Sequence, residues 1–423
     1  MNIDLLKFCK DIFKFPRSIT GNGTLQTLKF IQKFIPELNI KKIKSGTKIG
    51  DWVIPPEWNI IDGYVVDLEN NKKVIDFKKN NLHIIGYSDS IDTECSYDDL
   101  TRYLYTLEDQ PNAIPYITSY YEKRVGFCIS YNEYIKLNRN SKYKLFIDSN
   151  FDENGFLNYG EIIIKGASKK EIFLSTYICH PQMANDQLSG IAILTKLITY
   201  LQNLNNHYTY RVIFIPETIG SIAYINQNLA ELKKNVYAGY VISCVGDEGN
   251  WSIIQPRVKS NISYEIAKFV LNDNRLKINE YSWLKRSSDE RNFCAPNVDL
   301  PVSSISRSKH AKFPEYHTSL DNFNLVTEIG LNESYFILKK IILTLESSEV
   351  KPKIKVLGEP FLTKRGLYQT LSSKKNNLES ERFMNFISFC DGEHSLIEIS
   401  QKINCTYEFV MSTYNILLRE NLI

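Results

Sequence analysis

One segment carries most of the information about the architecture of this chain, and it reads IFLSTYICHPQMANDQLSG over residues 172–190. The apolar run at 172–178 is typical of a buried strand, and the run that follows Ser189-Gly190 has helical spacing. Open α/β sheets collect ligands where their strands end, so His180 and Asp186 are candidates to share one metal ion. A helix-capping Asp beside an incidental His is the alternative that this segment alone leaves open.

Three further apolar runs also resemble buried strands that end in polar residues. These runs cover residues 210–215, 238–245 and 301–305, and helical patterns at 191–204, 221–232 and 264–271 separate the strands. Alternating strands and helices predict a largely parallel sheet covered on both faces. The strand ends would gather His180, Asp186, Glu217 and His317 at one rim. A metallohydrolase needs such a set, with metal ligands and a carboxylate base converging from separate strands.

The order of these motifs resembles the M28-type zinc exopeptidase clan. More closely, the chain resembles the DUF4910/DUF2172 aminopeptidase-like family, which is associated with bacterial polysaccharide biosynthesis. The matching segments include PRSITG at 16–21, DWVIP at 51–55, CHP at 179–181, PETIGS at 216–221, SDER at 288–291 and EYHTSLD at 315–321. The resemblance implies a zinc-exopeptidase-like three-layer α/β sandwich with a mixed, largely parallel sheet. It also implies a zinc cofactor and hydrolysis of an amide.

The resemblance assigns a role to each residue of the predicted rim. His180, Asp186 and His317 correspond to metal ligands, and Glu217 to the general base that moves a proton during hydrolysis. Apart from the resemblance, Tyr316 directly precedes the predicted ligand His317, so its hydroxyl could stabilise an oxyanion, or the ring could serve only to pack.

Two positions depart from the clan pattern. Thr218 stands where the clan has a second glutamate that binds metal, and Ser243 or Cys244 stands where it has an aspartate. Each of two ions would therefore lose one ligand. One zinc could be held by the three remaining ligands, Glu217 or Cys244 could turn inward so that two ions bind, or no metal binds. We expect one zinc, or two with weak occupancy of the second site.

Four charged residues are predicted substrate contacts: Asp247, Asp289, Arg291 and Arg307. Asp289 and Arg291 belong to the family's Ser-Asp segment, and Asp247 could recognise an amine. A guanidinium matches the geometry of a carboxylate, so Arg307, with Lys309, could bind an acidic sugar. For Lys309 a solvated surface position is the more ordinary interpretation.

The bulk composition narrows the class of protein. With 423 residues the chain should form two or three domains, and its hydrophobic content of 43% is that of a globular protein. No apolar run reaches the length of a membrane span. The eight cysteines include no CxxC pair, which fits reduced thiols in the cytoplasm. A net charge of +3, spread along the chain, gives no reason to expect a nucleic-acid groove.

We expect four parts along the chain. They are N-terminal helices of the catalytic domain at 1–50, an inserted β-rich domain at 51–165, the catalytic α/β domain at 166–350 and a winged-helix-like module at 351–423. Strands of the insert are predicted at 63–66, 73–77, 82–86, 143–147 and 160–164. The insert's aromatics, Trp52, Trp58, Tyr116, Tyr120 and Tyr121, are expected mainly to build its own core.

The C-terminal module invites comparison with DNA-binding domains. Three helices are predicted, at 379–390, 396–403 and 406–419, after a catalytic-domain helix at 325–345 capped by SLDN at 319–322. Residues 381–423 carry six acids and three bases, a net charge of −3. A surface that faces phosphates should be basic, so protein contact, such as homo-oligomer formation through this module or the insert, is the better hypothesis.

The sequence thus predicts a cytoplasmic zinc-dependent amidohydrolase that acts on a small peptide or on an amide-bearing sugar, without a nucleic-acid or membrane partner. The competing hypothesis is a binding or assembly protein that keeps a peptidase fold with a degraded metal site. Thr218 and Cys244 favour that second hypothesis, whereas retention of His180, Asp186, Glu217 and His317 opposes it.

Overall fold

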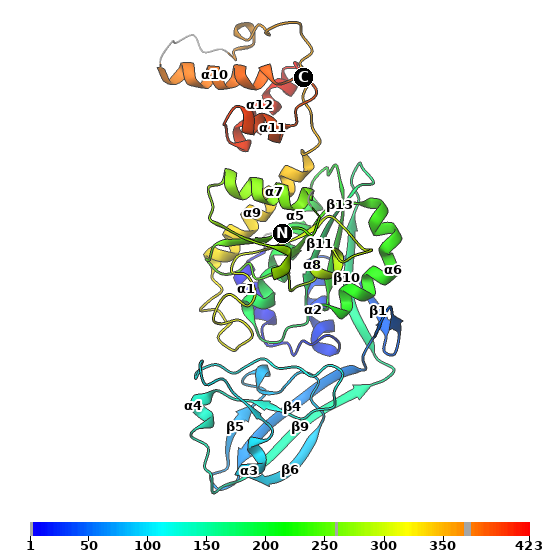
Figure 1. The fold of residues 1–423 in the computed structure, drawn as a ribbon, viewed down its shortest axis with the longest axis vertical. Coiled ribbons are helices and arrows are strands. Elements are labelled where there is room, and N and C mark those ends of the chain that lie inside the picture. Colours follow the sequence, from blue (N-terminus) through cyan, green and yellow to red (C-terminus); the bar gives the residue numbers. More distant parts are fainter. Residues whose placement is uncertain (1–2, 259–260, 368–373) are drawn as a thin grey trace. The chain divides into compact units, whose positions relative to one another are not determined.

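An eight-stranded mixed sheet forms the centre of the α/β part (Figure 1). The computed structural model describes residues 3–258, 261–367 and 374–423. The strand order is β1-β10-β12-β11-β13-β16-β14-β15. Four neighbouring strands run parallel: β12 (Thr209–Ile215), β11 (Glu171–Tyr177), β13 (Val236–Ile242) and β16 (Val302–Ser306). Almost every residue of these four strands is buried, as expected when helices cover both faces of a sheet.

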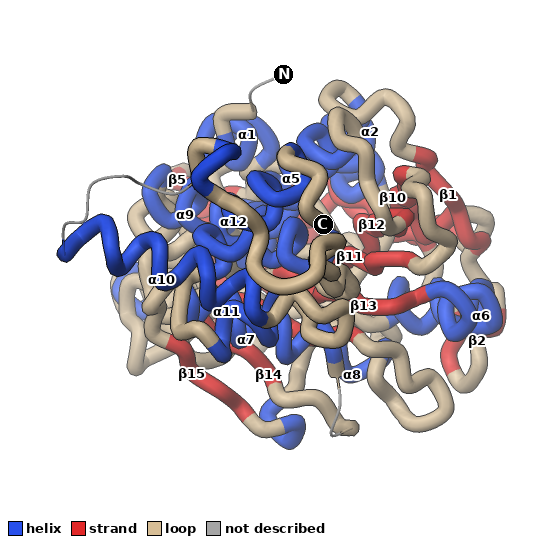
Figure 2. The backbone as a smooth tube through the Cα atoms, turned by 90° about the horizontal axis from the view of Figure 1, so that it is seen from above, coloured by secondary structure: helices blue, strands red, loops and turns tan. Residues whose placement is uncertain are grey.

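Helices cover the sheet on both faces and complete a three-layer sandwich. On one side lie α1 (Leu5–Ile12), α2 (Asn22–Gln32) and α5 (Gly190–Leu201), and on the other α6 (Ile219–Asn235) and α8 (Glu290–Phe293) (Figure 2). Side chains alternate along each strand. Phe173, Ile213 and Val241 therefore share one core with α6 and α8. Helices α7 (Ile262–Asp273) and α9 (Glu328–Glu346) complete the set.

The sheet is wider than the sequence predicted, because four strands flank the parallel core. They are β1 (Asn39–Lys44), β10 (Phe156–Ile164), β14 (Trp251–Ile254) and β15 (Ile278–Tyr281). Residues 1–50 thus contribute more than helices, and residues 156–164 belong to the main sheet, with β10 paired to β1 and β12. The sequence did not indicate β1 because lysines interrupt its apolar residues. Lysines are tolerated there, since an edge strand exposes much of its length to water.

A small β domain is inserted between β1 and β10. Its sheet has the order β5-β4-β9-β6, formed by β4 (Glu57–Asp67), β5 (Lys72–Asp76), β6 (Ile91–Ser96) and β9 (Lys142–Asp152). Short elements surround it: β2 (Lys48–Ile49), β3 (Trp52–Val53), α3 (Tyr97–Thr101), β7 (Leu104–Tyr105), β8 (Phe127–Cys128) and α4 (Tyr131–Tyr134). As expected of a core aromatic, Trp58 is buried and stacks on Tyr87 at 5.6 Å.

The strand predicted at 82–86 is wrong. A single 3-10 turn covers Asn81–His83, begun by the Asn80 side chain, which accepts a hydrogen bond from the backbone N–H of Leu82. The following residues Ile84 and Ile85 are buried in the loop. The run is apolar because it is buried, and burial alone does not distinguish a strand from a packed loop.

Two compact units make up the chain, residues 1–268 with 276–338 and residues 269–275 with 339–423. The second contains α10 (Lys374–Ser388), α11 (Leu396–Lys402) and α12 (Tyr407–Arg419), with a core that includes Phe386, Leu396, Ile399, Val410 and Leu417. Helix α9 begins at Glu328, three residues later than predicted, and Thr327 accepts a hydrogen bond from Gly330 there. Among the described residues, no helix combines the length and apolarity needed to cross a bilayer.

Candidate metal centre

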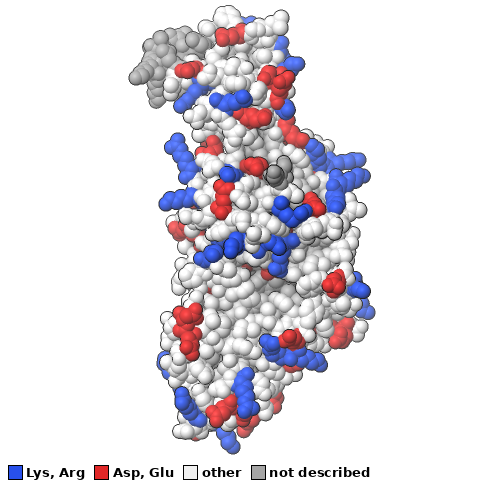
Figure 3. Space-filling model, in the orientation of Figure 1, with Lys and Arg blue, Asp and Glu red and all other residues white. Residues whose placement is uncertain are grey.

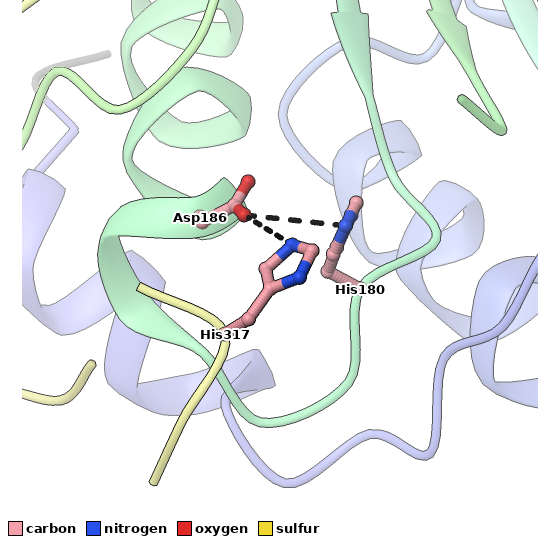
Figure 4. A group of neighbouring side chains, drawn as sticks. All are labelled: His180, Asp186 and His317. Carbon is pink, nitrogen blue, oxygen red and sulfur yellow. Dashed lines mark ion pairs between the residues drawn. The ribbon is translucent and has the colours of Figure 1, made fainter. Parts of the chain in front are cut away.

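Two loops at the carboxyl ends of the parallel strands β11 and β16 bring His180, Asp186 and His317 together (Figure 4). His180 follows β11, Asp186 lies in the turn before α5, and His317 lies on the loop after β16. The Asp186 Oδ2 atom is 3.2 Å from His317 Nε2 and 4.0 Å from His180 Nε2. All three candidate ligand atoms lie within 4.8 Å of one another.

The arrangement of Asp186 fits a metal ligand. Its side chain is 1% exposed, and Oδ1 accepts a hydrogen bond from the Tyr177 hydroxyl at 2.5 Å. The second oxygen, Oδ2, is buried without a hydrogen-bond partner, as is His317 Nε2. Burying a carboxylate oxygen in this way is costly unless a cation compensates it. Two ligand atoms on one tetrahedral zinc lie about 3.3 Å apart, close to the observed separation of Asp186 and His317.

The protonation states also suit metal binding, which requires a neutral imidazole and an ionised carboxylate. Burial lowers the pKa of His180 to about 4, against the opposing charge of Asp186, so the ring is neutral at pH 7. Burial alone would raise the pKa of Asp186, but the neighbouring His180 and His317 and the Tyr177 hydroxyl outweigh it and lower that pKa.

Hydrogen bonds from other side chains and from the insert hold each ligand in place, and one of these side chains, Asp321, lies on the same loop as His317. The guanidinium of Arg17, buried behind α1, donates from Nε to the His180 carbonyl at 2.7 Å. Asp321 accepts hydrogen bonds from the backbone N–H groups of residues 184, 185 and 186, the last at 2.8 Å. The backbone N–H of Tyr116, in the insert, donates to the His317 carbonyl at 2.9 Å. Asp321 is therefore an anchor for the Asp186 turn and not part of a cap for α9, a correction to the sequence prediction.

Tyr116 differs from the other aromatics of the insert, because it forms part of the site. Its ring centroid lies 5.5 Å from that of His180 and 5.0 Å from that of His317, at right angles to the latter. A short pairing between Pro115 and Thr318 joins the insert to the His317 loop. Sequence reasoning placed Tyr116 in a separate core, and only the position of the insert reveals its contact with the imidazoles.

Glu217 lies beside the three candidate ligands, on the loop between β12 and α6. Its Oε2 atom is 3.8 Å from His180 Nε2, and its Oε1 atom accepts a hydrogen bond from Ser288 at 3.2 Å. Burial raises the pKa of Glu217 well above its usual value, and the charges of Asp289 and Asp186 act in the same direction. A carboxylate with a raised pKa, at the edge of a candidate metal centre, is suited to accept a proton from water near neutral pH.

Thr218 and Cys244 supply no further ligand to the group. Thr218 has a left-handed backbone, with φ of 63°, and its hydroxyl accepts a hydrogen bond from Arg291 Nη2 at 2.5 Å. Cys244 is fully buried, and the cluster of mutually close ligand atoms found among the described residues does not include it. The described part of the chain therefore gathers three ligands, enough for one ion with an open position.

The predicted substrate contacts occupy different places. Asp289 has no exposed surface, and its Oδ1 accepts hydrogen bonds from Thr218 N and Ser221 Oγ, both at 2.8 Å. It holds the start of α6, while its Oδ2 is buried without a hydrogen-bond partner, and its contact with a substrate stays a prediction. Burial raises the pKa of this carboxyl to about 6. Arg291, by contrast, is half-buried and near Glu217.

Asp247 and Arg307 are also committed to the protein itself. Asp247 accepts hydrogen bonds from Asn185 Nδ2 and Ser308 Oγ, both at 2.8 Å. Arg307 donates to the Gly249 carbonyl at 2.8 Å and pairs with Glu333 at 3.2 Å. Both side chains thus have partners within the protein, and their contact with a substrate stays a prediction. Tyr316 does lie at the site, where its ring stacks on His317 at 3.9 Å with 13° between the planes.

Comparison with known proteins agrees with this architecture. Residues 6–348 match the family described as a domain of unknown function, DUF4910. The chain belongs to the DUF4910 family. Residues 350–423 match a winged helix-turn-helix family. A relative from Clostridium acetobutylicum, 37% identical over 99% of this chain and 96% of its own, has a name that joins polysaccharide biosynthesis with an aminopeptidase-like domain.

Solved structures extend the comparison to the fold. A crystal structure from C. acetobutylicum superposes with a TM-score of 0.90 at 36% identity, covering 99% of this chain and 95% of the other. BSAP, a zinc aminopeptidase from Bacillus subtilis, superposes with a TM-score of 0.56 at 12% identity. The match covers 81% of this chain and 93% of BSAP. An M28 peptidase precursor from Shewanella amazonensis superposes with a TM-score of 0.57 at 13% identity. The match covers 84% of this chain and 94% of the precursor. The DUF4910 part thus has the fold of M28 aminopeptidases.

Proposed function

We propose that this DUF4910 protein is a zinc-dependent hydrolase that cleaves an amide bond, aminopeptidase-like in its chemistry. One observation carries the proposal: Asp186 Oδ2, buried and without a hydrogen-bond partner, lies against the imidazoles of His180 and His317. The fold shared with a zinc aminopeptidase from B. subtilis supports the same class of reaction.

In this proposal His180, Asp186 and His317 hold the ion, which when bound supplies a Lewis acid that lowers the pKa of water. Glu217 accepts the proton of the attacking water at its carboxylate and then passes it to the departing amine nitrogen. The Ser288 hydroxyl orients that carboxylate. We further propose that Tyr316, whose ring stacks on His317, donates its hydroxyl to the developing oxyanion.

The substrate we propose is small, either a peptide or an amide-bearing sugar of surface polysaccharide biosynthesis. The name of the C. acetobutylicum relative supports the sugar. Both substrates need the same water, base and oxyanion donor, so the site geometry serves either. We propose a cytoplasmic location, on the reduced state that the unpaired cysteines suggest.

The alternative is a binding or assembly protein with a peptidase fold. The loss of ligands at Thr218 and Cys244 favours it. The three close ligand atoms and the adjacent carboxylate of Glu217 favour catalysis, because a protein without catalysis has no physical reason to bury them together.

Elemental analysis of the purified full chain tests the proposal. We expect about one zinc per chain, lost in His180→Ala and in His317→Ala, because each removes one of only three ligands. His394→Ala is the matched control, since His394 pairs with Asp391 in the second unit, outside the site. Absence of zinc from the wild-type chain, even after incubation with zinc, would overturn the proposal and favour the binding protein.

A further inference from the structure

Thr218, the residue that follows the proposed base, has a strained backbone. Its φ of 63° and ψ of −77° lie near the values of a γ-turn with positive φ, a conformation that is rare and costly for a β-branched residue. The backbone N–H of Ile219 donates to the Glu217 carbonyl at 2.8 Å and closes this turn. Strained residues that persist in a folded protein cluster at functional sites, so the turn calls for an explanation.

The start of α6 does not explain the turn. A threonine that caps a helix normally has an extended backbone, and its hydroxyl accepts a hydrogen bond from an N–H of the first helical turn. Thr218 occupies the capping position of α6, yet its side chain makes no such bond to that first turn, all of which the structure describes. An ordinary cap would keep φ negative and avoid the strain. The positive φ of Thr218 therefore has a purpose other than capping.

Two side chains of one segment hold the turn. Asp289 Oδ1 accepts a hydrogen bond from the Thr218 N–H at 2.8 Å, and Arg291 Nη2 donates to the Thr218 hydroxyl at 2.5 Å. On the face drawn in Figure 3, Lys and Arg side chains gather in a band across the α/β part, where contact with water is their ordinary state. Arg291 differs, because it is half-buried and its guanidinium binds the hydroxyl of a neighbouring loop.

Glu217, the proposed base, is held at three points. Its carbonyl closes the γ-turn, its N–H donates to Cys179 Sγ at 3.2 Å, and its Oε1 accepts a hydrogen bond from Ser288 at 3.2 Å. Held in this way, Oε2 lies 3.8 Å from His180 Nε2. Rotation of Thr218 to a negative φ would break the hydrogen bond that closes the turn and would redirect the backbone just after Glu217.

We propose that Asp289 and Arg291 position the general base: they hold Thr218 in its strained turn, and the turn keeps the Glu217 carboxylate beside the candidate metal centre. Both act on Glu217 through Thr218, so they are positioning residues. The bond from the guanidinium is charge-assisted and thus of the stronger kind. The inference rests on the proposed function and gives Thr218 a task of its own at a position where a metal ligand is lost.

Crystal structures of the full chain test the positioning without any need for turnover. Thr218→Val keeps the shape of the side chain but cannot accept a hydrogen bond, so we expect φ at residue 218 to become negative and Glu217 to move away from Ser288. Arg291→Met removes the same bond from its other end and should have the same effect. Thr218→Ser keeps the hydroxyl and should restore the wild-type turn.

Steady-state kinetics on the same variants should separate kcat from KM. Misplacing a catalytic group by about 1 Å can cost roughly 10²-fold in rate, so kcat should fall about 10- to 100-fold in Thr218→Val and in Arg291→Met, with KM and zinc content unchanged. The double variant should lose no more than the weaker single one, because both changes break one bond. Thr93→Val and Arg102→Met, both exposed in the insert, are the matched controls and should keep the wild-type kcat.

An undisplaced Glu217 in both Thr218→Val and Arg291→Met would overturn the inference. So would an unchanged kcat in both variants, and a raised KM with unchanged kcat in Arg291→Met would identify a substrate contact instead. Failure of the proposed hydrolysis is distinct, since it appears as lack of zinc or of turnover in the wild type. The position of the Glu217 carboxylate is read from the crystal structures in either case.

Discussion

At the scale of single residues, the proposed chemistry depends on the different surroundings of the two carboxylate oxygens of Asp186. Tyr177 holds one carboxylate oxygen, which leaves the other turned toward His180 and His317. Glu217 also lies near His180, with its Oε2 3.8 Å from Nε2, but it is outside the group of mutually close ligand atoms found among the described residues. Binding and proton transfer are thus assigned to different carboxylates, and each can be removed separately.

Glu217→Gln should abolish amide hydrolysis while zinc content and fold stay unchanged. The amide has nearly the same shape but cannot take a proton, so a fall in kcat of roughly 10²- to 10⁴-fold is expected. Steady-state kinetics on a panel of peptides and N-acyl sugars, with zinc measured on the same samples, would check it. Glu153→Gln, on the exposed turn between β9 and β10, is the matched control. Unchanged kcat in the Glu217 variant would show that another group is the base.

The pH dependence of the hydrolytic activity should reflect the ionisation of Glu217. The base must be ionised to act, and burial raises the pKa of Glu217. Activity should therefore be lost as pH falls through this raised pKa, so that the acidic limb of kcat/KM lies above the ordinary glutamate value of about 4.3. A pH–rate profile from pH 4 to 9 tests this, and a limb at or below the ordinary value would contradict the assignment.

Residue types and strand ends sufficed to predict that His180, Asp186, Glu217 and His317 meet. They did not suffice for Asp247 or Arg307, whose charges suggested substrate contacts. Asp247 binds Asn185 and Arg307 binds Glu333. These partners are distant in the sequence, and no local sequence pattern predicts such pairs. Whether a charged side chain is free for a ligand depends on tertiary neighbours, which a single sequence does not give.

At the scale of elements, one buried arginine joins three strands and a helix. Arg211 of β12 donates to Glu171 of β11 at 2.7 Å, to Glu161 of β10 at 3.1 Å and to Glu231 of α6 at 2.7 Å. Its side chain is 3% exposed. The arginine thus compensates two buried carboxylates at the centre of the sheet, where an unpaired charge would be costly.

Arg211→Met should lower the free energy of unfolding by about 3–5 kcal/mol, because it leaves Glu171 buried without its cation and Glu161 with Lys41 alone. Denaturation in guanidinium chloride, followed by circular dichroism, measures this change. Arg102→Met removes an exposed ion pair with Asp99 and should have little effect. Equal free energies of unfolding for the two variants would contradict the prediction. They would mean that the buried carboxylates are hydrated or protonated at a small cost in free energy.

Some elements were predicted from the sequence more accurately than others, and the buried charges are one reason. The parallel strands are uniformly apolar, and their periodicity located them to within a few residues. In β10 the buried Glu161 interrupts the apolar run, and in β1 lysines occupy exposed edge positions, so these strands were not assigned to the sheet. The start of α9 was misplaced because Asp321 has a capping residue type but binds amides 135 or more residues away.

At the scale of the whole molecule, a hydrolase-like unit and a winged-helix unit each have a core of their own. The winged helix-turn-helix match would ordinarily suggest DNA binding. Residues 381–423, which contain the three predicted helices, carry six acids and three bases, and the whole matched range 350–423 carries ten bases and eight acids, so the module is not strongly basic. We therefore propose that the second unit contacts protein, a further copy of the chain included.

The full chain should not bind duplex DNA in a salt-dependent way. Non-specific DNA binders reach dissociation constants of about 10⁻⁴ to 10⁻⁶ M through many phosphate contacts. Ten bases against eight acids over residues 350–423 do not make the strongly basic surface that such contacts need. Fluorescence anisotropy of a labelled duplex, at about 50 and 200 mM salt, would detect such binding. Micromolar affinity that weakens as salt rises would contradict the prediction and revive a regulatory role for this unit.

The hydrogen bonds that Arg17, Asp321 and Tyr116 make to the two ligand loops have a thermodynamic consequence. Because these loops are already ordered, capture of an ion costs little conformational entropy, and the chain does not depend on the ion to fold. Removal of metal by a chelator should then lower the melting temperature only by the mass-action contribution of a bound ligand. Amide hydrogen exchange at residues 184–186 should stay slow in the metal-free protein, unlike that of small domains whose folding is coupled to zinc.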